Sequence, residues 1–231
     1  MIISVKLNKG GSAKTWTSVQ VAHALALNEK KVLLLTSDSQ NNTLDFLGYD
    51  GSVTTGLKAA VNGKEHEIYR LRDNLEVLPL EDNFLSKTFF KKLKKYFDKM
   101  RKKYDFIIID SIPTKGVDDH FVELSDKVII PIYCDRVTVE GALEVIENIG
   151  KNKILAIIPS RFKNEKNQKE YHELLKESLN DLDVLLTDPV KHMSFIAELI
   201  DKGKTIWESN NKKITEVQDI FIELTGVIIN E

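Results

Sequence analysis

Short apolar stretches rich in Ile, Val and Leu recur along the chain and alternate with longer segments in which apolar residues return every three or four positions. The short stretches are typical of buried strands, and the longer segments are typical of amphipathic helices. The expected strands are Ile2–Leu7, Lys31–Thr36, Leu75–Leu80, Phe106–Asp110, Lys127–Ile132, Ile154–Pro159 and Asp183–Thr187. The expected helices are about Thr15–Asn28, Asn83–Arg101, Thr138–Ile149, Lys166–Leu179, Ser194–Lys202 and Thr215–Thr225.

This alternation predicts a doubly wound α/β fold, with a mostly parallel sheet and helices on both faces, because crossover helices between parallel strands pack back on the sheet. No Pro/Gly/Ser-rich linker or fixed-period repeat divides the chain, so we expect a single domain over residues 1–231. Because the first strand begins at Ile2, we expect no helix-turn-helix before it and no operator binding by such an extension.

Composition and charge narrow the function classes. The 231 residues are 42% hydrophobic and carry a formal net charge of -2, so affinity for nucleic acid would have to come from a local basic patch. The single cysteine, Cys134, excludes an internal disulfide, a Cys-based zinc site and an iron–sulfur cluster. No apolar run approaches the roughly 20 residues that span a bilayer, so we expect a soluble, cytoplasmic protein.

The turn between the first expected strand and helix has the pattern of a phosphate-binding loop. Such a loop directs backbone N–H groups and a helix N-terminus at phosphates. Lys14 is expected at the β- and γ-phosphates of a nucleotide, and the Thr15 hydroxyl at Mg²⁺. The full segment is Lys9-Gly10-Gly11-Ser12-Ala13-Lys14-Thr15.

This loop resembles the deviant Walker A motif of ParA and MinD ATPases, Lys-Gly-Gly-x-x-Lys-Ser/Thr. The resemblance implies that Lys9 reaches the nucleotide of a second subunit, so that ATP is held between two chains of a homodimer. Ala13 stands where the family usually has Gly, which costs about 1–2 kcal/mol if the position needs a positive φ. Trp16 replaces a second Thr, so a hydroxyl contact to the α-phosphate is missing and weaker ATP binding is expected.

Two acidic residues follow expected strands at the sheet edge where α/β proteins bind ligands. The segment after the second strand resembles the family's Asp-x-Asp-Pro-Gln. Asp38 matches its second Asp, which implies that it orients the attacking water and responds to the Mg²⁺-bound γ-phosphate, whereas Thr36 replaces the first. The run ending in Asp110, followed by Pro113, resembles a Walker B motif that holds a Mg²⁺-bound water.

Less specific motifs extend the resemblance over nearly the whole chain. Segments after two late strands correspond to those that frame the adenine in the family, with Pro159 and Arg161 in one and Asp188 and Pro189 in the other. Farther on, Gly203–Glu208 is similar to a ParA segment that ends Gly-Lys-Thr-Ile-Phe-Glu.

Basic residues gather in two places. Residues 87–103 contain nine Lys or Arg against Asp98 alone, on an expected helix with an apolar stripe, and such lysine faces are usually only solvated. The resemblance implies a different site, because relatives bind DNA non-specifically as ATP dimers through basic residues late in the chain. The corresponding DNA-binding candidates are Lys191, Lys202, Lys204, Lys212 and Lys213.

The leading hypothesis is a DNA-partition ATPase, plasmid or chromosomal, that uses ATP and Mg²⁺. It would dimerise on the nucleoid and be released when a ParB-like centromere-binding partner stimulates hydrolysis. The alternative is a MinD-like positioning ATPase acting on a membrane or protein cargo. A membrane role requires a basic amphipathic C-terminal helix, whereas Ile214–Glu231 carries four acidic residues and no lysine, so no membrane contact is expected. An electron carrier like the nitrogenase iron protein is excluded, because the chain has too few cysteines to bind an iron–sulfur cluster. A metabolic ligase of related fold would need a substrate site, and the sequence shows none.

Overall fold

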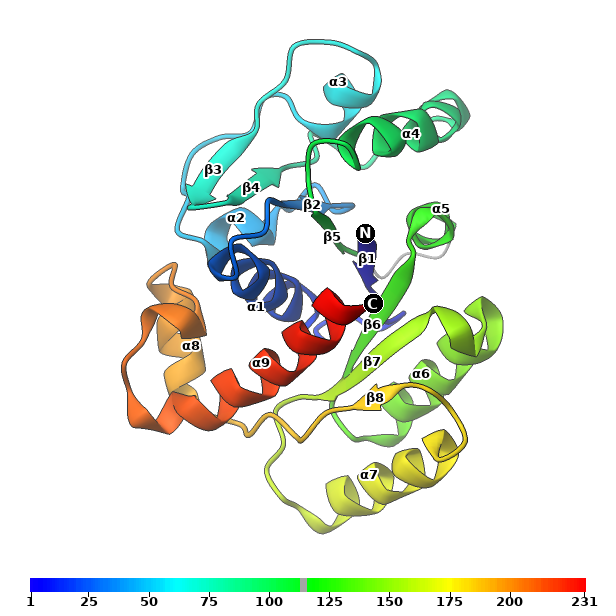
Figure 1. Ribbon diagram of the computed structural model, residues 1–231, viewed down its shortest axis with the longest axis vertical. Helices are drawn as coiled ribbons and strands as arrows, with labels where there is room; N and C mark the ends of the chain where they lie inside the picture. Colours follow the sequence, from blue (N-terminus) through cyan, green and yellow to red (C-terminus); the bar gives the residue numbers. More distant parts are fainter. Residues whose placement is uncertain (113–115) are drawn as a thin grey trace.

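A central β-sheet organises the molecule (Figure 1). The structure, a computed structural model, describes residues 1–112 and 116–231, and within them the sheet has the strand order β3-β4-β2-β5-β1-β6-β7-β8. The strands are β1 (Ile2–Val5), β2 (Val32–Thr36), β3 (Tyr69–Arg72), β4 (Leu75–Leu78), β5 (Phe106–Asp110), β6 (Lys127–Ile132), β7 (Ile154–Pro159) and β8 (Leu185–Leu186).

Neighbouring strands run parallel except for β3 and β4. The predicted doubly wound, mostly parallel sheet is therefore confirmed, but its strict strand–helix alternation is wrong at the β3 edge. The chain reverses there through Asn74, whose φ of 59° lies in the left-handed region that Asn tolerates. Strand β3 was not predicted, because Arg70 and Arg72 interrupt the apolar run that identifies the other strands.

The predicted helices are present, and α2, α3 and α5 were not predicted. The α-helices are α1 (Lys14–Leu27), α2 (Asn42–Phe46), α3 (Leu57–Val61), α4 (Lys87–Met100), α5 (Val117–Leu124), α6 (Arg136–Ile149), α7 (Lys166–Leu179), α8 (Ser194–Asp201) and α9 (Thr215–Asn230). Short 3₁₀ helices are η1 (Lys151–Lys153), η2 (Ile206–Glu208) and η3 (Lys212–Ile214).

Both faces of the sheet are covered because side chains alternate along each buried strand. In β5, Ile108 packs in the cluster formed with α1, α8 and α9, whereas Ile107 and Ile109 pack in the cluster formed with α3, α4 and α5. Helices α6 and α7 cover the β6–β7 part of the second face.

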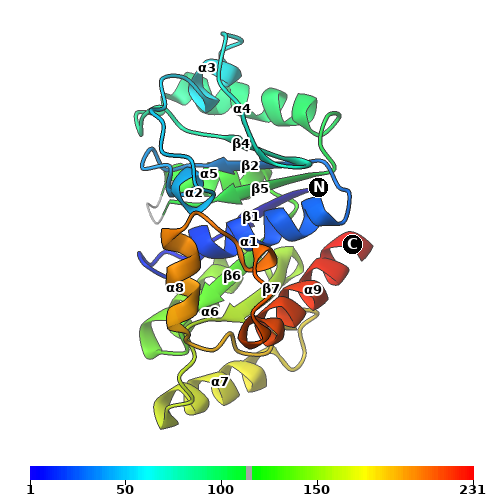
Figure 2. The same ribbon diagram turned by 90° about the vertical axis from the view of Figure 1, so that its left-hand side faces the viewer.

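The sheet brings three strand ends together at its carboxyl edge. Val5 of β1 and Thr36 of β2 both pair with Asp110 of β5, so the segments that follow these strands meet. Figure 2 shows the loop after β1, the short helix α2 and the start of α5 on one side of the molecule. Ligands of α/β proteins bind at this edge. Pro113, part of the predicted Walker B segment, lies outside the described residues.

Candidate functional site

The loop between β1 and α1 has the backbone of a phosphate-binding turn. Gly11 and Ala13 have φ values of 71° and 64°, in the left-handed region. The N–H of Thr17 donates to the Ala13 carbonyl at 2.9 Å and starts the helix directly after the turn. Ala13 therefore has the positive φ at which a side chain is unfavourable. Its Cβ destabilises this backbone conformation by about 1–2 kcal/mol relative to the Gly that the family usually has there.

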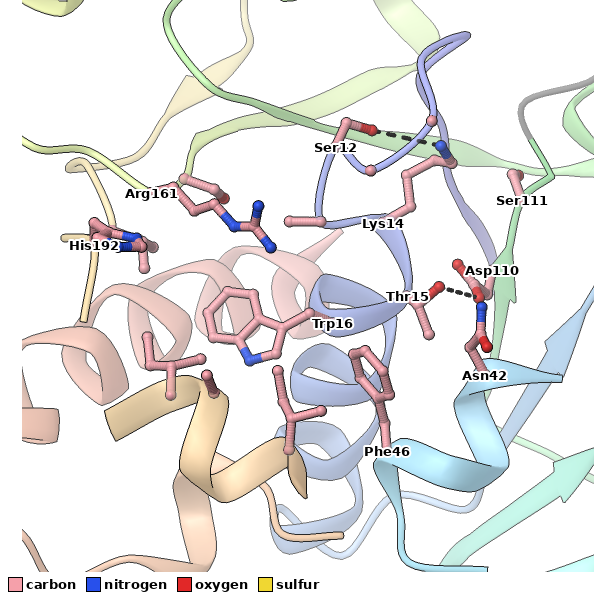
Figure 3. A pocket seen from close by; sticks show the side chains of 18 of the residues that line it. Ser12, Lys14, Thr15, Trp16, Asn42, Phe46, Asp110, Ser111, Arg161 and His192 are labelled. Carbon is pink, nitrogen blue, oxygen red and sulfur yellow. Dashed lines mark hydrogen bonds between the residues drawn. The ribbon is translucent and has the colours of Figure 1, made fainter. Parts of the chain in front are cut away.

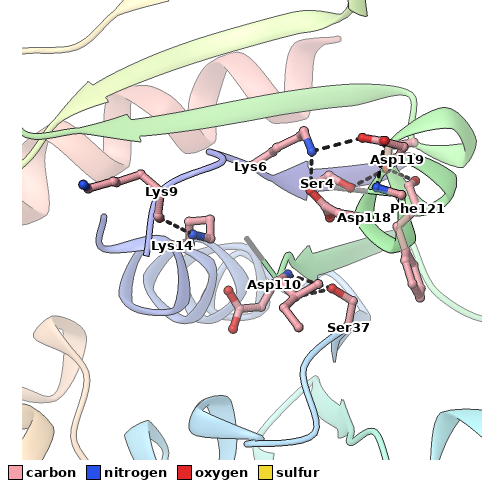
Figure 4. A network of polar contacts seen from close by, with 12 residues as sticks. Ser4, Lys6, Lys9, Lys14, Ser37, Asp110, Asp118, Asp119 and Phe121 are labelled. Carbon is pink, nitrogen blue, oxygen red and sulfur yellow. Dashed lines mark hydrogen bonds and ion pairs between the residues drawn. The ribbon is translucent and has the colours of Figure 1, made fainter. Parts of the chain in front are cut away.

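Lys14 is buried beneath this loop. Its Nζ donates to the Lys9 carbonyl at 2.8 Å (Figure 4) and lies 3.4 Å from the Ser12 hydroxyl (Figure 3). Burial lowers the pKa of Lys14, and the nearby Asp110 carboxylate opposes that change. The ammonium is thus held at the N-terminus of α1, where a bound phosphate would gain both the lysine charge and the helix dipole.

Asp110, at the end of β5, lies directly beside the start of α1. The Thr15 hydroxyl donates to its Oδ2 at 2.8 Å (Figure 3), and the Ser18 hydroxyl lies 3.4 Å from its Oδ1. Burial raises the pKa of Asp110 to about 7, while the Thr15 hydrogen bond and the Lys14 charge act in the opposite direction. A hydroxyl and a carboxylate oxygen at this position fit Mg²⁺, which prefers oxygen ligands and completes its shell with water and phosphate.

Asp38 lies in the loop after β2. Its Oδ1 accepts the N–H of Gln40 at 3.0 Å, and its own N–H donates to the Thr36 hydroxyl at 3.0 Å. Thr36, which replaces the family's first Asp, therefore holds the loop backbone in place. Asp38 is half-buried and faces the same cavity as Lys14 and Asp110.

The cavity at this edge has a volume of about 440 Å³ and two kinds of wall. Its polar end is formed by the phosphate-binding loop, Asp38 and Asp110, and its apolar end by α2, α8 and Trp16 (Figure 3). Lining residues that the sequence predicted are Gly10, Gly11, Ser12, Ala13, Lys14, Thr15, Trp16, Asp38, Asp110, Arg161 and Lys191. The sequence did not single out the other lining residues, although some stand in the predicted segments; they are Gln40, Asn42, Phe46, Ser111, Ser160, Val190, His192, Met193, Ile196, Ala197 and Ile200.

The two segments expected to frame the adenine both reach the cavity, but not through every residue singled out in them. Arg161 lines the cavity, whereas Pro159, Asp188 and Pro189 do not. Their chain neighbours Ser160 and Val190 take the lining positions, because the Val190 N–H donates to the Pro159 carbonyl at 2.8 Å and joins the two loops.

Trp16 both lines the cavity and packs in the core. Its indole meets the ring of Phe221 on α9 edge to face, with ring centroids 5.3 Å apart. This contact fastens α9 to the first turns of α1. The residue that replaces the family's second Thr is thus a packing residue as well as a wall of the site.

Lys9 differs from the other loop residues. Its side chain is exposed, does not line the cavity and points away from Lys14 (Figure 4). Its backbone carbonyl contributes to the site, because it accepts the Lys14 ammonium and the Ser12 hydroxyl.

The late basic residues lie on several different elements, and Lys191 among them lines the cavity. The Lys191 ammonium pairs with Glu216, so part of its charge is neutralised. Lys202 and Lys204 follow α8, and Lys212 and Lys213 lie in η3; all four side chains are exposed. No helix among residues 1–112 and 116–231 has the length and apolar character needed to cross a bilayer.

The glycine turn, the buried lysine at a helix N-terminus, and the paired hydroxyl and carboxylate define a P-loop nucleotide-binding protein. The family model described as AAA domain matches residues 1–158. The chain therefore belongs to this family, and it is a P-loop ATPase of the ParA/MinD type.

Curated relatives agree with this assignment. The chain is 28% identical over 162 residues to the sporulation initiation inhibitor protein Soj of Bacillus subtilis. It is 27% identical over 164 residues to the chromosome partitioning protein ParA of Myxococcus xanthus. Each alignment covers 64% of this chain, and they cover 64% of Soj and 57% of ParA, less than two-thirds of either relative.

Solved structures share the fold over almost the full length. An aspartate-to-alanine variant of McdA from Cyanothece, in complex with ATP, superposes with a TM-score of 0.81 at 19% identity, covering 98% of this chain and 95% of McdA. The septum site-determining protein MinD of Pyrococcus horikoshii, in complex with Mg-ADP, has a TM-score of 0.76 at 21% identity, covering 97% and 93%.

Proposed function

We propose that this chain is a DNA-partition ATPase, which binds Mg·ATP, dimerises around it and holds DNA non-specifically until hydrolysis separates the two subunits. The observation that carries the proposal is the meeting of Lys14, Thr15 and Asp110 at the N-terminus of α1. ParA of Myxococcus xanthus, a chromosome partitioning protein by name, supports the cellular role.

The residues of the site would have different roles in binding and hydrolysis. Lys14 would exchange the Lys9 carbonyl for the β- and γ-phosphates, and Thr15 and Asp110 would hold Mg²⁺, directly and through water. Mg²⁺ would neutralise charge on the phosphates. Asp38 would orient the attacking water. The water oxygen would bond to the γ-phosphorus while the bond from that phosphorus to the β–γ bridging oxygen breaks, and ADP and phosphate would then leave.

Lys9 would act on the partner subunit, because its side chain leaves its own cavity. ATP held between two chains then makes dimerisation depend on the γ-phosphate. DNA held by the late lysines would be retained only while the dimer lasts, and a ParB-like partner that speeds hydrolysis would release it from the nucleoid. Phosphate contacts of this kind carry no sequence information.

A MinD-like positioning ATPase is the second candidate, favoured by the fold shared with MinD. Its membrane form finds no support in α9, since the apolar residues Val217, Phe221 and Leu224 are buried. The exposed side of the same helix carries Glu216 and Glu223. We therefore retain a protein cargo as the form of this alternative.

Calorimetric titration with Mg·ATP tests the nucleotide site. Lys14→Ala should abolish binding, because it removes the ammonium at the phosphate position, and Lys9→Ala should bind ATP as a monomer with nearly unchanged affinity. Unchanged affinity in the Lys14 variant would overturn the site assignment. A wild-type chain that binds Mg·ATP but hydrolyses none of it, with or without DNA, would overturn the proposed activity.

A further inference from the structure

Phe84 is an exposed aromatic residue at the nucleotide edge. Among the large apolar side chains in the described part of the chain it is the most exposed, at 81%, compared with 57% for Leu27. Single exposed apolar residues are common and mark no site by themselves. Phe84 differs in its position, because it lies in the connection between β4 and α4. This connection follows the carboxyl end of β4, which runs parallel to β2, so it belongs to the same edge of the sheet as the phosphate-binding loop.

The loop that carries Phe84 is held by several polar contacts. The Glu81 carboxylate accepts the N–H groups of Lys58 and Ala59 at 2.8 and 2.7 Å. The Lys58 ammonium donates to Asp82 Oδ1 at 2.7 Å, and the same oxygen accepts the Phe84 N–H at 2.7 Å. The phenyl ring is therefore displayed from an ordered loop, which reduces the entropy lost when a partner buries it.

The same loop is joined to the loop that contains Asp38. The Ser39 N–H donates to Asn83 Oδ1 at 2.9 Å. The Asn41 side chain and the Leu80 backbone exchange two hydrogen bonds of 2.8 Å. The surface around Phe84 is thus continuous with the loop that would orient the attacking water.

We propose that Phe84 is an apolar anchor of the interface between two copies of this chain; this inference rests on the ATP dimer of the proposed function. A second copy is the fitting partner because the exposed Lys9 side chain points out of its own cavity at this same edge, as the proposed ATP dimer requires. A two-fold interface repeats each contact, so both Phe84 rings would be buried together. Aromatic anchors of this kind contribute strongly at the core of an interface.

Sedimentation velocity with a non-hydrolysable ATP analogue and Mg²⁺ tests the role of Phe84. Phe84→Ser should weaken dimerisation by about tenfold or more, because two apolar rings lose their burial, while Phe84→Leu should keep most of it. Leu27→Ser is the matched control, since Leu27 is exposed at the far end of α1. All of these variants should bind Mg·ADP with wild-type affinity.

The outcomes separate this inference from the proposed function. A wild-type dimer with an equally stable Phe84→Ser dimer overturns the anchor and leaves the ATP dimer standing. A wild-type chain that binds the analogue but stays monomeric overturns both. If Phe84→Ser dimerises normally but loses the stimulation of hydrolysis by a partner protein, the ring belongs to a surface for that partner, and the anchor is again overturned.

Discussion

The Thr15 hydroxyl donates a 2.8 Å hydrogen bond to Oδ2 of Asp110, although the two residues are 95 positions apart. They meet because β1 and β5 are neighbouring parallel strands with Val5 opposite Asp110. One oxygen comes from the first turn of α1 and the other from the end of β5, so the two strands together determine the distance between the proposed Mg²⁺ ligands. The proposed metal site is therefore positioned by the centre of the sheet.

Asp38→Ala should trap an ATP-bound dimer. Within the part of the chain that the structure describes, the carboxylate accepts the Gln40 N–H of its own loop, and in the variant Thr15 and Asp110 would still hold Mg²⁺ and nucleotide. Hydrolysis should fall roughly tenfold or more, because the attacking water loses its orienting group. Size-exclusion chromatography with ATP measures the dimer, and Asp45→Ala in α2 is the control. A variant that stays monomeric in ATP would make Asp38 a structural residue.

Trp16→Thr should change stability and nucleotide affinity in opposite directions. Loss of the contact with Phe221 should lower the free energy of unfolding by about 2–4 kcal/mol, because a cavity is left between α1 and α9. The new hydroxyl should tighten ATP binding of the folded protein by about 0.5–1.5 kcal/mol, the contribution of one hydrogen bond to the α-phosphate.

Urea unfolding and calorimetry measure these two effects separately. Trp16→Phe is the control, since it keeps an aromatic ring and adds no hydroxyl. Unchanged unfolding of Trp16→Thr would contradict the packing role. Weaker ATP binding would contradict the expected phosphate contact.

His23 should make stability depend on pH. Its Nδ1 lies 2.7 Å from the Thr205 hydroxyl, and burial lowers the pKa of His23 to about 4. Between pH 6.5 and 4 the unfolded chain holds this proton and the folded chain does not, so the free energy of unfolding should fall as the pH drops. His23 should lower the free energy of unfolding by roughly 3 kcal/mol between pH 6.5 and pH 4.

Urea unfolding at several pH values isolates the contribution of His23. In His23→Gln the slope of unfolding free energy against pH should be shallower than in the wild-type protein, because no imidazole is left to take up the proton. Parallel curves for the two proteins would show that His23 is not held neutral by burial.

DNA retention should distinguish the two basic surfaces. If the late lysines form the site, replacing Lys202, Lys204, Lys212 and Lys213 by Ala should abolish ATP-dependent retention. Replacing Lys91, Lys92, Lys94 and Lys95 on α4 should have little effect. Each phosphate contact removed should flatten the slope of log affinity against log salt by about 0.9. A flattened slope in the α4 variant alone would place the DNA site on that helix.

The sequence predicts the parts of this molecule that are encoded locally. Continuous apolar runs such as Phe106–Asp110 predict central strands, and the contiguous loop ending in Lys14 and Thr15 predicts the phosphate site, because a strand, a turn and a helix start adjoin in the chain. The edge strand β3 and the five-residue helices α2 and α3 are too short for a periodic signal.

The apolar end of the cavity could not be read from the sequence for a different reason. Phe46 and Ile196 belong to helices that are far apart in the chain and meet only when α2 packs against α8. Their residue types are those of any helix that packs on a core, so no motif marks them. The role of Trp16 against Phe221 is equally a product of tertiary packing.

The solution mass in the presence and absence of a non-hydrolysable ATP analogue tests whether ATP holds two copies of this chain together. Light scattering coupled to size exclusion should show a chain of 26.3 kDa without nucleotide and twice that mass with Mg²⁺ and the analogue. Lys9→Ala should bind the analogue and remain at 26.3 kDa, because the residue acts across the interface. A wild-type chain that stays at the monomer mass with its site saturated, or a Lys9 variant that dimerises like the wild type, would contradict the account.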